Sequence, residues 1–225
     1  MELYAEPLWL TLKLAAVTTG VLLVIGIPLA WRLSRSRSRW KEAVDALVTL
    51  PLVLPPTVLG FYLLIALGPE GIIGKPLEYA GIGSLAFTFT GLVIGSAIYS
   101  LPFMVKPLQT AFESLSEETL DAAATLGAAP MDRFFSVALP LSRVGLVTAV
   151  GQTFAHTIGE FGVALMIGGA IPGKTLVISI AIYNHVETLE YAVAHALSAG
   201  LIVFSFVLLF LLSRINRRRE PLRAV

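Results

Sequence analysis

The stretch AVAHALSAGLIVFSFVLLFLL, residues 192–212, contains no Asp, Glu, Lys or Arg and is long enough to cross a bilayer as one helix. A bilayer core of about 30 Å requires about 20 helical residues. Four further segments meet this requirement, so the predicted spans are Leu8–Trp31, Asp45–Leu67, Leu85–Val105, Val144–Gly168 and Ala192–Leu212. We predict an all-α, polytopic integral membrane protein with about five transmembrane helices, in a single domain over residues 1–225. The apolar run Leu176–Ile182 is too short to span, and we expect it to be either re-entrant or packed on the surface.

The composition agrees with this class. Of the 225 residues, 56% are hydrophobic and 14% are charged, against about 45–50% and about 25% in soluble domains. This composition excludes a disordered, collagen-like or coiled-coil chain. The absence of cysteine excludes disulfide scaffolds, cysteine-ligated metal sites and cysteine nucleophiles. The net charge of +1 gives no reason to expect a nucleic-acid partner.

The basic residues are placed asymmetrically along the chain. All of them except Lys13, Lys75 and Lys174 lie in the loops after the first, third and fifth predicted spans. By the positive-inside rule these loops are cytoplasmic, so the N-terminus lies outside and the C-terminus inside. The chain begins with the acidic stretch MELYAEP, which is not typical of a cleaved signal peptide. We expect a multi-pass protein of a bacterial or archaeal cytoplasmic (inner) membrane.

Prolines interrupt the second predicted span at Pro51, Pro55 and Pro56. Each proline removes a backbone donor, and in hydrocarbon such a break is stable only where protein or a water-filled cavity covers it. One interpretation is that Pro55 and Pro56 belong to a gate or a translocation pathway. The alternative is a simple kink that helps the helices to pack.

The longest polar stretch, at about residues 113–140, lies between the third and fourth spans. Ser116 is a candidate N-cap and is followed by two glutamates, Gly127 is placed to end that helix, and Pro130 suits the start of a second one. We expect a short helical hairpin with an apolar strip. This hairpin either docks on a partner or lies back on the cytoplasmic face of the protein itself.

This stretch is similar to the EAA motif, E-A-A-x3-G-x9-I-x-L-P, of the permease subunits of type I ABC importers. The spacing matches throughout, with Asp in place of Glu and Val in place of Ile. The matching residues are Asp121, Ala122, Ala123, Gly127, Val137, Leu139 and Pro140. The resemblance implies the type I ABC importer permease (MetI-like) fold, with this segment as the coupling helix that docks on a cytoplasmic ATPase.

The resemblance also implies the partners. They are a second copy of this chain in a homodimer, two cytoplasmic ABC ATPase subunits, an extracytoplasmic binding protein and the lipid bilayer. ATP hydrolysis then belongs to the ATPase, so this chain is not an enzyme and needs no cofactor. Leu50–Leu64, Gly68–Gly74, Ile158–Gly162 and Ile171–Thr175 resemble the molybdate transporter permeases, which implies that the partner is a molybdate-binding protein. Sulfate permeases share the G-E-F-G pattern, so tungstate, sulfate and thiosulfate remain alternatives.

Glu160 is the only carboxylate deep in a predicted span, and such a residue is a candidate for function. Because it would repel an anion, we expect it to hold a gate or helix break through hydrogen bonds to backbone near Gly159 and Gly162. The gate and pathway candidates are Pro55, Pro56, Gly159, Glu160, Phe161 and Gly162. Alternatively, Glu160 carries protons in an ion-coupled secondary transporter, a class in which internal repeats are common but for which we find none.

Residues Gly168–Thr175 match the phosphate-binding pattern G-x4-G-K-[ST]. A functional loop of this kind follows a strand, whereas this copy follows a predicted span on the outer side. We interpret the match as coincidence and expect Lys174 to lie at the outer mouth, where it attracts an anion or an anionic docking surface. The three histidines lack metal-binding spacing, so we predict no metal site.

Overall fold

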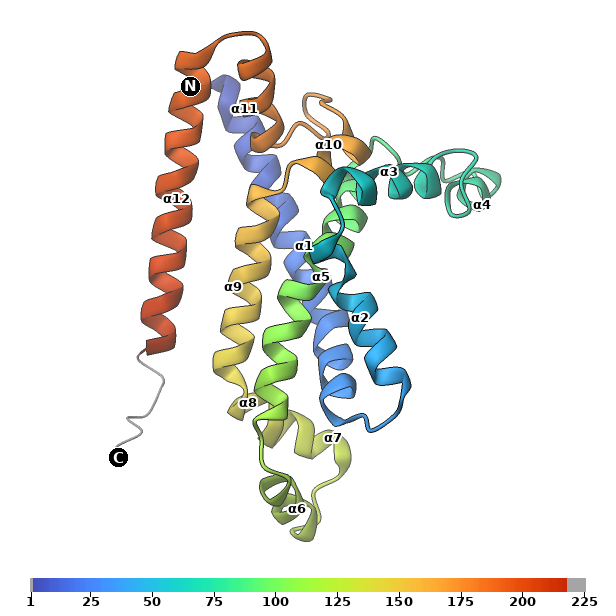
Figure 1. The fold of residues 1–225 in the computed structure, drawn as a ribbon, viewed down its shortest axis with the longest axis vertical. Helices are drawn as coiled ribbons and strands as arrows, with labels where there is room; N and C mark the ends of the chain where they lie inside the picture. Colours follow the sequence, from blue (N-terminus) through green and yellow to red (C-terminus); the bar gives the residue numbers. More distant parts are fainter. Residues whose placement is uncertain (1, 218–225) are drawn as a thin grey trace.

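The chain forms a bundle of helices in a computed structural model that describes residues 2–217 (Figure 1). The basic residues beyond Arg217, which contribute to the predicted orientation, lie outside this range. The helices are α1 (Glu2–Arg35), α2 (Trp40–Val53), α3 (Pro56–Leu67), α4 (Gly74–Tyr79), α5 (Phe89–Glu113), α6 (Glu117–Thr125), α7 (Pro130–Arg133), the π-helix η1 (Phe134–Ala138), α8 (Leu139–Leu141), α9 (Arg143–Gly159), α10 (Gly162–Gly168), α11 (Ile178–Glu187) and α12 (Tyr191–Arg217). Residues 2–217 contain no β-strand, which confirms the predicted all-α class.

Three helices are each long and apolar enough to cross a membrane, namely α1, α5 and α12. They correspond to the first, third and fifth predicted spans. Two further pairs of helices pass the same test only together, because each pair is bent. The structure therefore has three straight spans, or up to five if each bent pair counts as one.

The second predicted span, Asp45–Leu67, is broken at its prolines, as the sequence predicts. Its two halves, α2 and α3, are bent by 111° at Leu54 and Pro55. Leu54 is extended, with ψ at 137°, because the proline ring after it disfavours the helical conformation. Pro56 then occupies the first turn of α3, where its missing N–H is tolerated. In Figure 1, α3 consequently points sideways, away from the long helices, and leads to α4.

The fourth predicted span, Val144–Gly168, is also discontinuous. Helix α9 ends at Gly159, Glu160 is extended with ψ at 130°, and α10 begins at Gly162. A second bend of 73° separates the α7–α8 region from α9. The expected helix break at Glu160 is therefore present.

The central core is formed where α1, α5 and α9 pack together. Fully buried side chains of all three meet here, among them Leu22, Met104 and Ala149. Near the other end of α1, the Thr11 hydroxyl accepts a hydrogen bond from the backbone N–H of Ile178, at 2.8 Å. The run Leu176–Ile182 is thus packed against the bundle as the start of α11.

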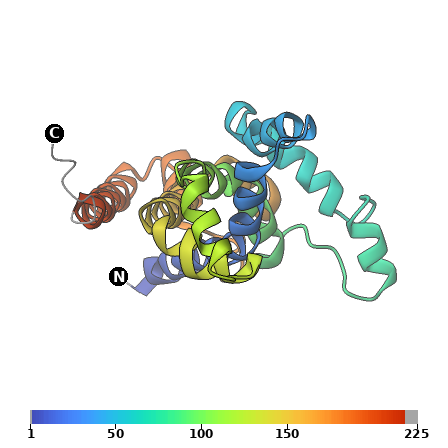
Figure 2. The same cartoon turned by 90° about the horizontal axis from the view of Figure 1, so that it is seen from below.

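Two parts of the chain stand away from this core. Helix α12 packs mainly on α9 and α11, and no residue in its most apolar stretch is buried. Seen from below, α12 and the α3–α4 arm project on opposite sides of the bundle (Figure 2). Their large exposed apolar surface needs lipid or another protein chain to cover it.

Packing at Gly91 gives a stability prediction with an internal control. A Cβ at Gly91 would overlap the backbone carbonyl oxygen of Leu85, whereas a Cβ at Gly20 of α1 would meet nothing within 4 Å. We expect Gly91→Ala to lower the unfolding free energy by about 1–3 kcal/mol. Gly20→Ala should raise it by up to about 1 kcal/mol, because alanine favours the helix. Melting temperatures of the purified protein in detergent test this, and an equal effect of the two changes would contradict the packing described.

Candidate functional site

The polar stretch forms a helical hairpin at one end of the molecule (Figure 1). The Ser116 hydroxyl accepts a hydrogen bond from the N–H of Thr119 at 3.3 Å, so α6 begins where the sequence predicts. Gly127 follows the helix with φ at +86°, a conformation that strains any residue with a Cβ. Pro130 opens α7, also as predicted.

Helix α6 is well formed but poorly covered. None of its residues is buried, and its contacts within the chain are chiefly to α7 and η1. Asp121 and Ala122 are exposed, Ala123 is half-buried, and Leu126 just after the helix is 89% exposed. The hairpin therefore projects from the bundle and presents apolar side chains to its surroundings.

The second half of the EAA-like motif forms the bend that leads into α9. Val137 lies in the π-helix η1, and Leu139 and Pro140 lie in the short helix α8. Val137 and Leu139 are half-buried, and Pro140 is exposed. This half of the motif thus sets the direction of the hairpin relative to α9, whereas the first half forms the exposed helix.

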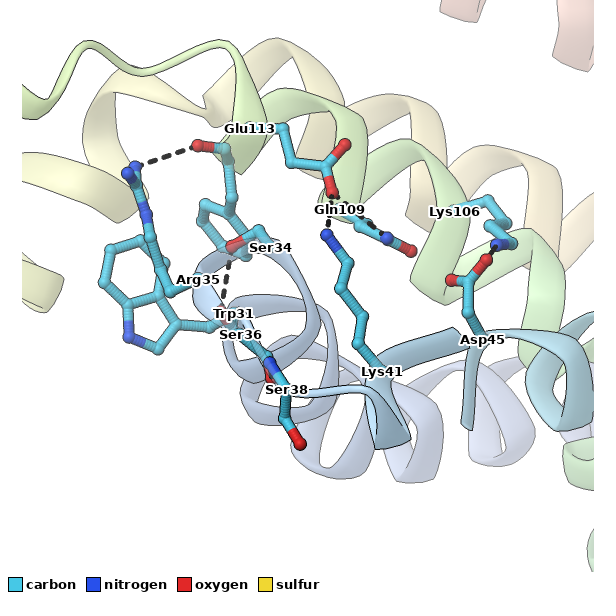
Figure 3. A network of polar contacts seen from close by, with 11 residues as sticks. Trp31, Ser34, Arg35, Ser36, Ser38, Lys41, Asp45, Lys106, Gln109 and Glu113 are labelled. Atoms are coloured by element: carbon cyan, nitrogen blue, oxygen red, sulfur yellow. Dashed lines mark hydrogen bonds and ion pairs between the residues drawn. The ribbon is translucent and has the colours of Figure 1, made fainter. Parts of the chain in front are cut away.

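The end of α1 holds the junction between α5 and α6 (Figure 3). The Arg35 guanidinium donates hydrogen bonds to the backbone oxygens of Phe112, at 3.0 Å, and Leu115, at 3.4 Å. It also lies 5.1 Å from the Trp31 ring, which packs edge-on against Phe134 of η1. The last carbonyls of a helix have no partner within that helix, and Arg35 supplies one. The base of the hairpin is consequently joined to α1 as well as to α5.

Ion pairs join α2 to α5 beside this junction (Figure 3). Lys106 and Asp45 pair at 2.6 Å and are each about one-third exposed, and Lys41 pairs with Glu113 at 3.1 Å. The sequence analysis missed these pairs. Their partners are more than 60 residues apart in the chain, so no local pattern could have revealed them.

A pocket of about 490 Å³ lies at the two helix breaks. Its lining comes from α3, α5, α9 and the α9–α10 break, and consists of Pro56, Thr57, Tyr99, Ala155, His156, Gly159, Glu160, Phe161 and Gly162. Five of the six predicted gate and pathway residues thus come together, while Pro55 is the N-cap of α3 and is not among the lining residues. A Cβ at Gly162 would lie 2.8 Å from Pro56, so this glycine lets the two breaks pack closely.

The expected hydrogen bonds from the Glu160 carboxylate to nearby backbone are absent from residues 2–217, and that prediction is wrong. Glu160 is only 4% exposed, and neither of its carboxylate oxygens has a hydrogen-bond partner there. Ser96 of α5 interacts with the carboxyl group, although its hydroxyl also lacks a good hydrogen bond. The break is held instead through the Glu160 carbonyl, which accepts a hydrogen bond from the Ser179 hydroxyl at 2.6 Å.

His156 contributes to the same pocket through packing. Its Nδ1 lies 2.9 Å from the Ser100 hydroxyl, and its ring stacks on Phe103 with centroids 4.0 Å apart. Within residues 2–217 no group of three His, Cys, Asp or Glu side chains is arranged to hold a metal. The pocket can therefore offer hydrogen bonds from a ring nitrogen, a phenol and a threonine hydroxyl.

Residues Gly168–Thr175, which match the phosphate-binding pattern, form a tight turn between α10 and α11. The buried Thr175 hydroxyl donates to the carbonyl of Gly168 at 2.6 Å and accepts from the N–H of Ile171 at 3.2 Å. The turn follows α10, so the preceding strand that a phosphate-binding loop needs is replaced by a helix. Lys174 is exposed in this turn, which Figure 1 places at the end of the bundle opposite α6.

Comparison with known proteins agrees with this architecture. Residues 23–221 match the family model of the binding-protein-dependent transport system inner membrane component. The chain therefore belongs to this family of membrane permease subunits. It is 58% identical over 213 residues to the molybdenum transport system permease protein ModB of Azotobacter vinelandii, which covers 95% of this chain and 94% of that protein.

More distant relatives include a molybdenum permease and a probable sulfate permease. ModB of Escherichia coli K12 is 35% identical over 223 residues, with 95% of this chain and 97% of that protein covered. The probable sulfate transport system permease protein cysT of Zygnema circumcarinatum is 35% identical over 214 residues, with 95% and 73% covered.

Solved structures confirm the fold. A bacterial ABC transporter involved in alginate import matches 98% of this chain and 81% of its own, with a TM-score of 0.76 and 19% identity. The MetNI methionine ABC transporter matches 95% and 94%, with a TM-score of 0.73 and 20% identity. The predicted ABC importer permease fold is thereby established.

The turn at Thr175 gives a second prediction. Thr175→Val should lower the unfolding free energy by about 1–3 kcal/mol, because the carbonyl of Gly168 loses its donor in a buried hydrogen bond and the N–H of Ile171 loses its acceptor. Lys174→Ala, the neighbouring control, should leave the melting temperature unchanged. Neither variant nor the wild type should be stabilised by ATP when the chain is purified alone. A rise in melting temperature with ATP that Lys174→Ala removes would reinstate a nucleotide site.

Proposed function

We propose that this chain is the membrane-spanning permease subunit of an ATP-driven importer of molybdate. The assignment of molybdate as the substrate rests on the 58% identity to a molybdenum permease along almost the whole length of both chains. Sulfate or thiosulfate is the second candidate, supported by the 35% identity to a probable sulfate permease. Tungstate shares the charge and tetrahedral shape of molybdate and falls within the same proposal. Membership of a binding-protein-dependent family argues against an ion-coupled secondary transporter.

The projecting α6 hairpin is the proposed coupling helix. Helix α6 is capped and well formed, has no buried residue, and is followed by the exposed Leu126. Such a helix is suited to fit into a cleft of another protein. Ala122 and Ala123 are small enough for close approach, and Asp121 presents a charge at the same surface. We propose that the partner is a cytoplasmic ATPase, which hydrolyses the ATP, so that this chain performs no chemistry itself.

The assembly we propose is a homodimer of this chain with two ATPase subunits and an extracytoplasmic molybdate-binding protein. The uncovered α12 and the projecting α3–α4 arm provide surface for a second copy and for lipid. One of the similar solved structures is an alginate ABC transporter in complex with a periplasmic protein loaded with an alginate pentasaccharide. Lys174 lies at the end opposite α6, where such a binding protein would dock.

In the proposed mechanism, closure of the ATPase pair draws the two coupling helices together. Arg35 and the aromatic cluster around Trp31 pass this motion to α1 and α5. The pocket at the paired helix breaks opens outward to receive the anion, and hydrolysis returns it to the inward-facing state. Pro55, Pro56 and the stretch from Gly159 to Gly162 are the proposed moving parts, because broken helices have few backbone hydrogen bonds to lose there.

The experiment that tests this function is reconstitution of the chain with its ATPase and binding protein in liposomes. We expect molybdate-loaded binding protein to stimulate ATP hydrolysis and molybdate uptake. Stimulation by sulfate but not by molybdate would select the second candidate. No stimulation by any tetrahedral oxyanion would reject both.

The coupling-helix assignment predicts the behaviour of Gly127→Val. A β-branched residue at φ +86° costs about 1–2 kcal/mol and distorts the end of α6. The ATPase should then dissociate or hydrolyse ATP without response to loaded binding protein, while the membrane abundance of the chain is unchanged. Asp121→Ala should have a smaller effect, because an exposed charge contributes about 1 kcal/mol or less.

Gly81→Val is the matched control for Gly127→Val. Gly81 also has positive φ, +77°, and open space around it, but it lies in the arm after α4. It should keep the ATPase bound during co-purification. Normal molybdate uptake by the Gly127→Val protein, at the same membrane abundance as the wild type, would contradict the assignment of α6 as the coupling helix.

The proposed orientation is testable because the chain contains no cysteine. Ser38→Cys, between α1 and α2, should resist an impermeant thiol reagent in intact cells and react after the membrane is opened. Glu70→Cys, whose native side chain is 88% exposed beyond α3, should react in intact cells. Labelling of Ser38→Cys in intact cells would show that the orientation is the opposite of the one proposed.

A further inference from the structure

One face of the α5–α9 pair carries many polar and small residues, with Phe103 and Pro107 among them. On α9 these residues follow steps of three and four, which place them on one side of a helix. The same spacing occurs on α5. We call this face the α5–α9 seam, and it comprises Tyr99, Phe103, Pro107, Thr110, Ser114, Gly145, Thr148, Gln152, His156 and Gly159.

The seam has a pocket at each end. The pocket at the helix breaks contains Tyr99, His156 and Gly159 from the seam. A second pocket, of about 440 Å³, lies toward the α6 end of the same two helices. Its polar lining consists of Thr110, Ser114, Ser142, Thr148 and Gln152, and it includes no Lys, Arg, Asp or Glu.

Close contact between the helices forms the floor of the second pocket. A Cβ at Gly145 would overlap the Ala111 side chain and lie 3.1 Å from the carbonyl oxygen of Pro107. Because α5 and α9 are in close contact here, the side chains on either side of the contact form the walls of the pocket. Gly145 therefore keeps the groove open between them.

Ser142 is the most informative residue of this wall. It is only 3% exposed and lines the pocket, and its hydroxyl has no hydrogen-bond partner among residues 2–217. A buried hydroxyl of this kind normally has a partner, and each exception requires an explanation. A ligand that accepts a hydrogen bond in the pocket would provide the missing partner.

Gln152 and Thr110 are exposed on the same wall. Gly151 packs against Leu212 of α12, so Gln152 lies at the depth where α12 exposes Leu211, which is 52% exposed. At that depth one side of the molecule shows leucine and the seam shows an amide and hydroxyls. Polar groups are costly against hydrocarbon, so the seam faces water or a hydrogen-bonding ligand rather than lipid.

We propose that the α5–α9 seam is a wall of the anion pathway and that its second pocket is an inner binding site for a tetrahedral oxyanion. This inference rests on the proposed function and extends it to particular residues. The donors are the Gln152 amide and the hydroxyls of Thr110 and Ser142. Neutral donors suit a pathway, because an ion must be bound well enough to enter and weakly enough to leave. A lysine or arginine in the same place would hold a dianion too tightly.

Accessibility of single cysteines tests the seam without any substrate. In the reconstituted transporter, Gln152→Cys should react with a charged thiol reagent supplied on both sides of the membrane. Leu211→Cys is the matched control at the same depth, and it should not react because it faces lipid. An unreactive Gln152→Cys, or one that instead cross-links to the second copy as part of a dry interface, would overturn the proposal.

Protection and transport then test the ligand. Excess molybdate should slow the labelling of Gln152→Cys several-fold and leave the labelling of Ser38→Cys, in the loop after α1, unchanged. Gln152→Glu keeps the shape and adds a negative charge, so uptake should fall at least about tenfold while loaded binding protein still stimulates hydrolysis. Gln152→Asn keeps the donor and should transport within about threefold of the wild type.

The two proposals fail in different ways. If the wild type transports no oxyanion but Gln152→Cys is labelled and Leu211→Cys is not, the proposed substrate is wrong and the water-filled seam stands. If the wild type transports molybdate and Gln152→Glu transports it equally well, the inner site is wrong and the permease function stands.

Discussion

Two helix breaks packed against each other are the constraint on which the rest of the structure depends. Backbone groups freed at Pro55–Pro56 and at Glu160–Phe161 cannot face hydrocarbon, so each break needs protein or water beside it. The fold brings them together at one pocket, with Gly162 against Pro56. Helices α3 and α10, which follow the two breaks, pack against each other. A straight second or fourth span would remove the pocket.

The α6 hairpin is joined to the bundle at its base. Arg35 binds the carbonyls at the end of α5, and Trp31 packs on Phe112 and Phe134. The Lys106–Asp45 pair adds α2 to this assembly, and its partial burial makes it less screened by salt than a fully exposed ion pair. The α6 hairpin is thus attached to three helices at its base and to almost nothing at its tip. In the proposed mechanism, a force applied at the tip would reach the breaks along α5 and α9, which pack against each other.

The two pockets on the α5–α9 seam contain no lysine or arginine among their lining residues. Two lysines lie inside the long helices of the bundle, Lys13 over the Phe89 ring and Lys106 in an ion pair with Asp45, and neither lines these pockets. Glu160 lines the pocket at the helix breaks but is only 4% exposed, and its backbone carbonyl accepts a hydrogen bond from the Ser179 hydroxyl. Its backbone therefore helps to hold the break.

The sequence by itself determined the all-α membrane class, three of the spans, the cap at Ser116, the glycine stop at Gly127 and the places where two helices break. These features depend on hydropathy, capping and proline chemistry, which act between residues close in the chain. Only the tertiary structure decided the 111° bend, the unpaired carboxyl of Glu160, the Lys106–Asp45 pair and the polar seam. Each of these depends on which helix faces which, and that is settled by contacts between residues far apart in the sequence.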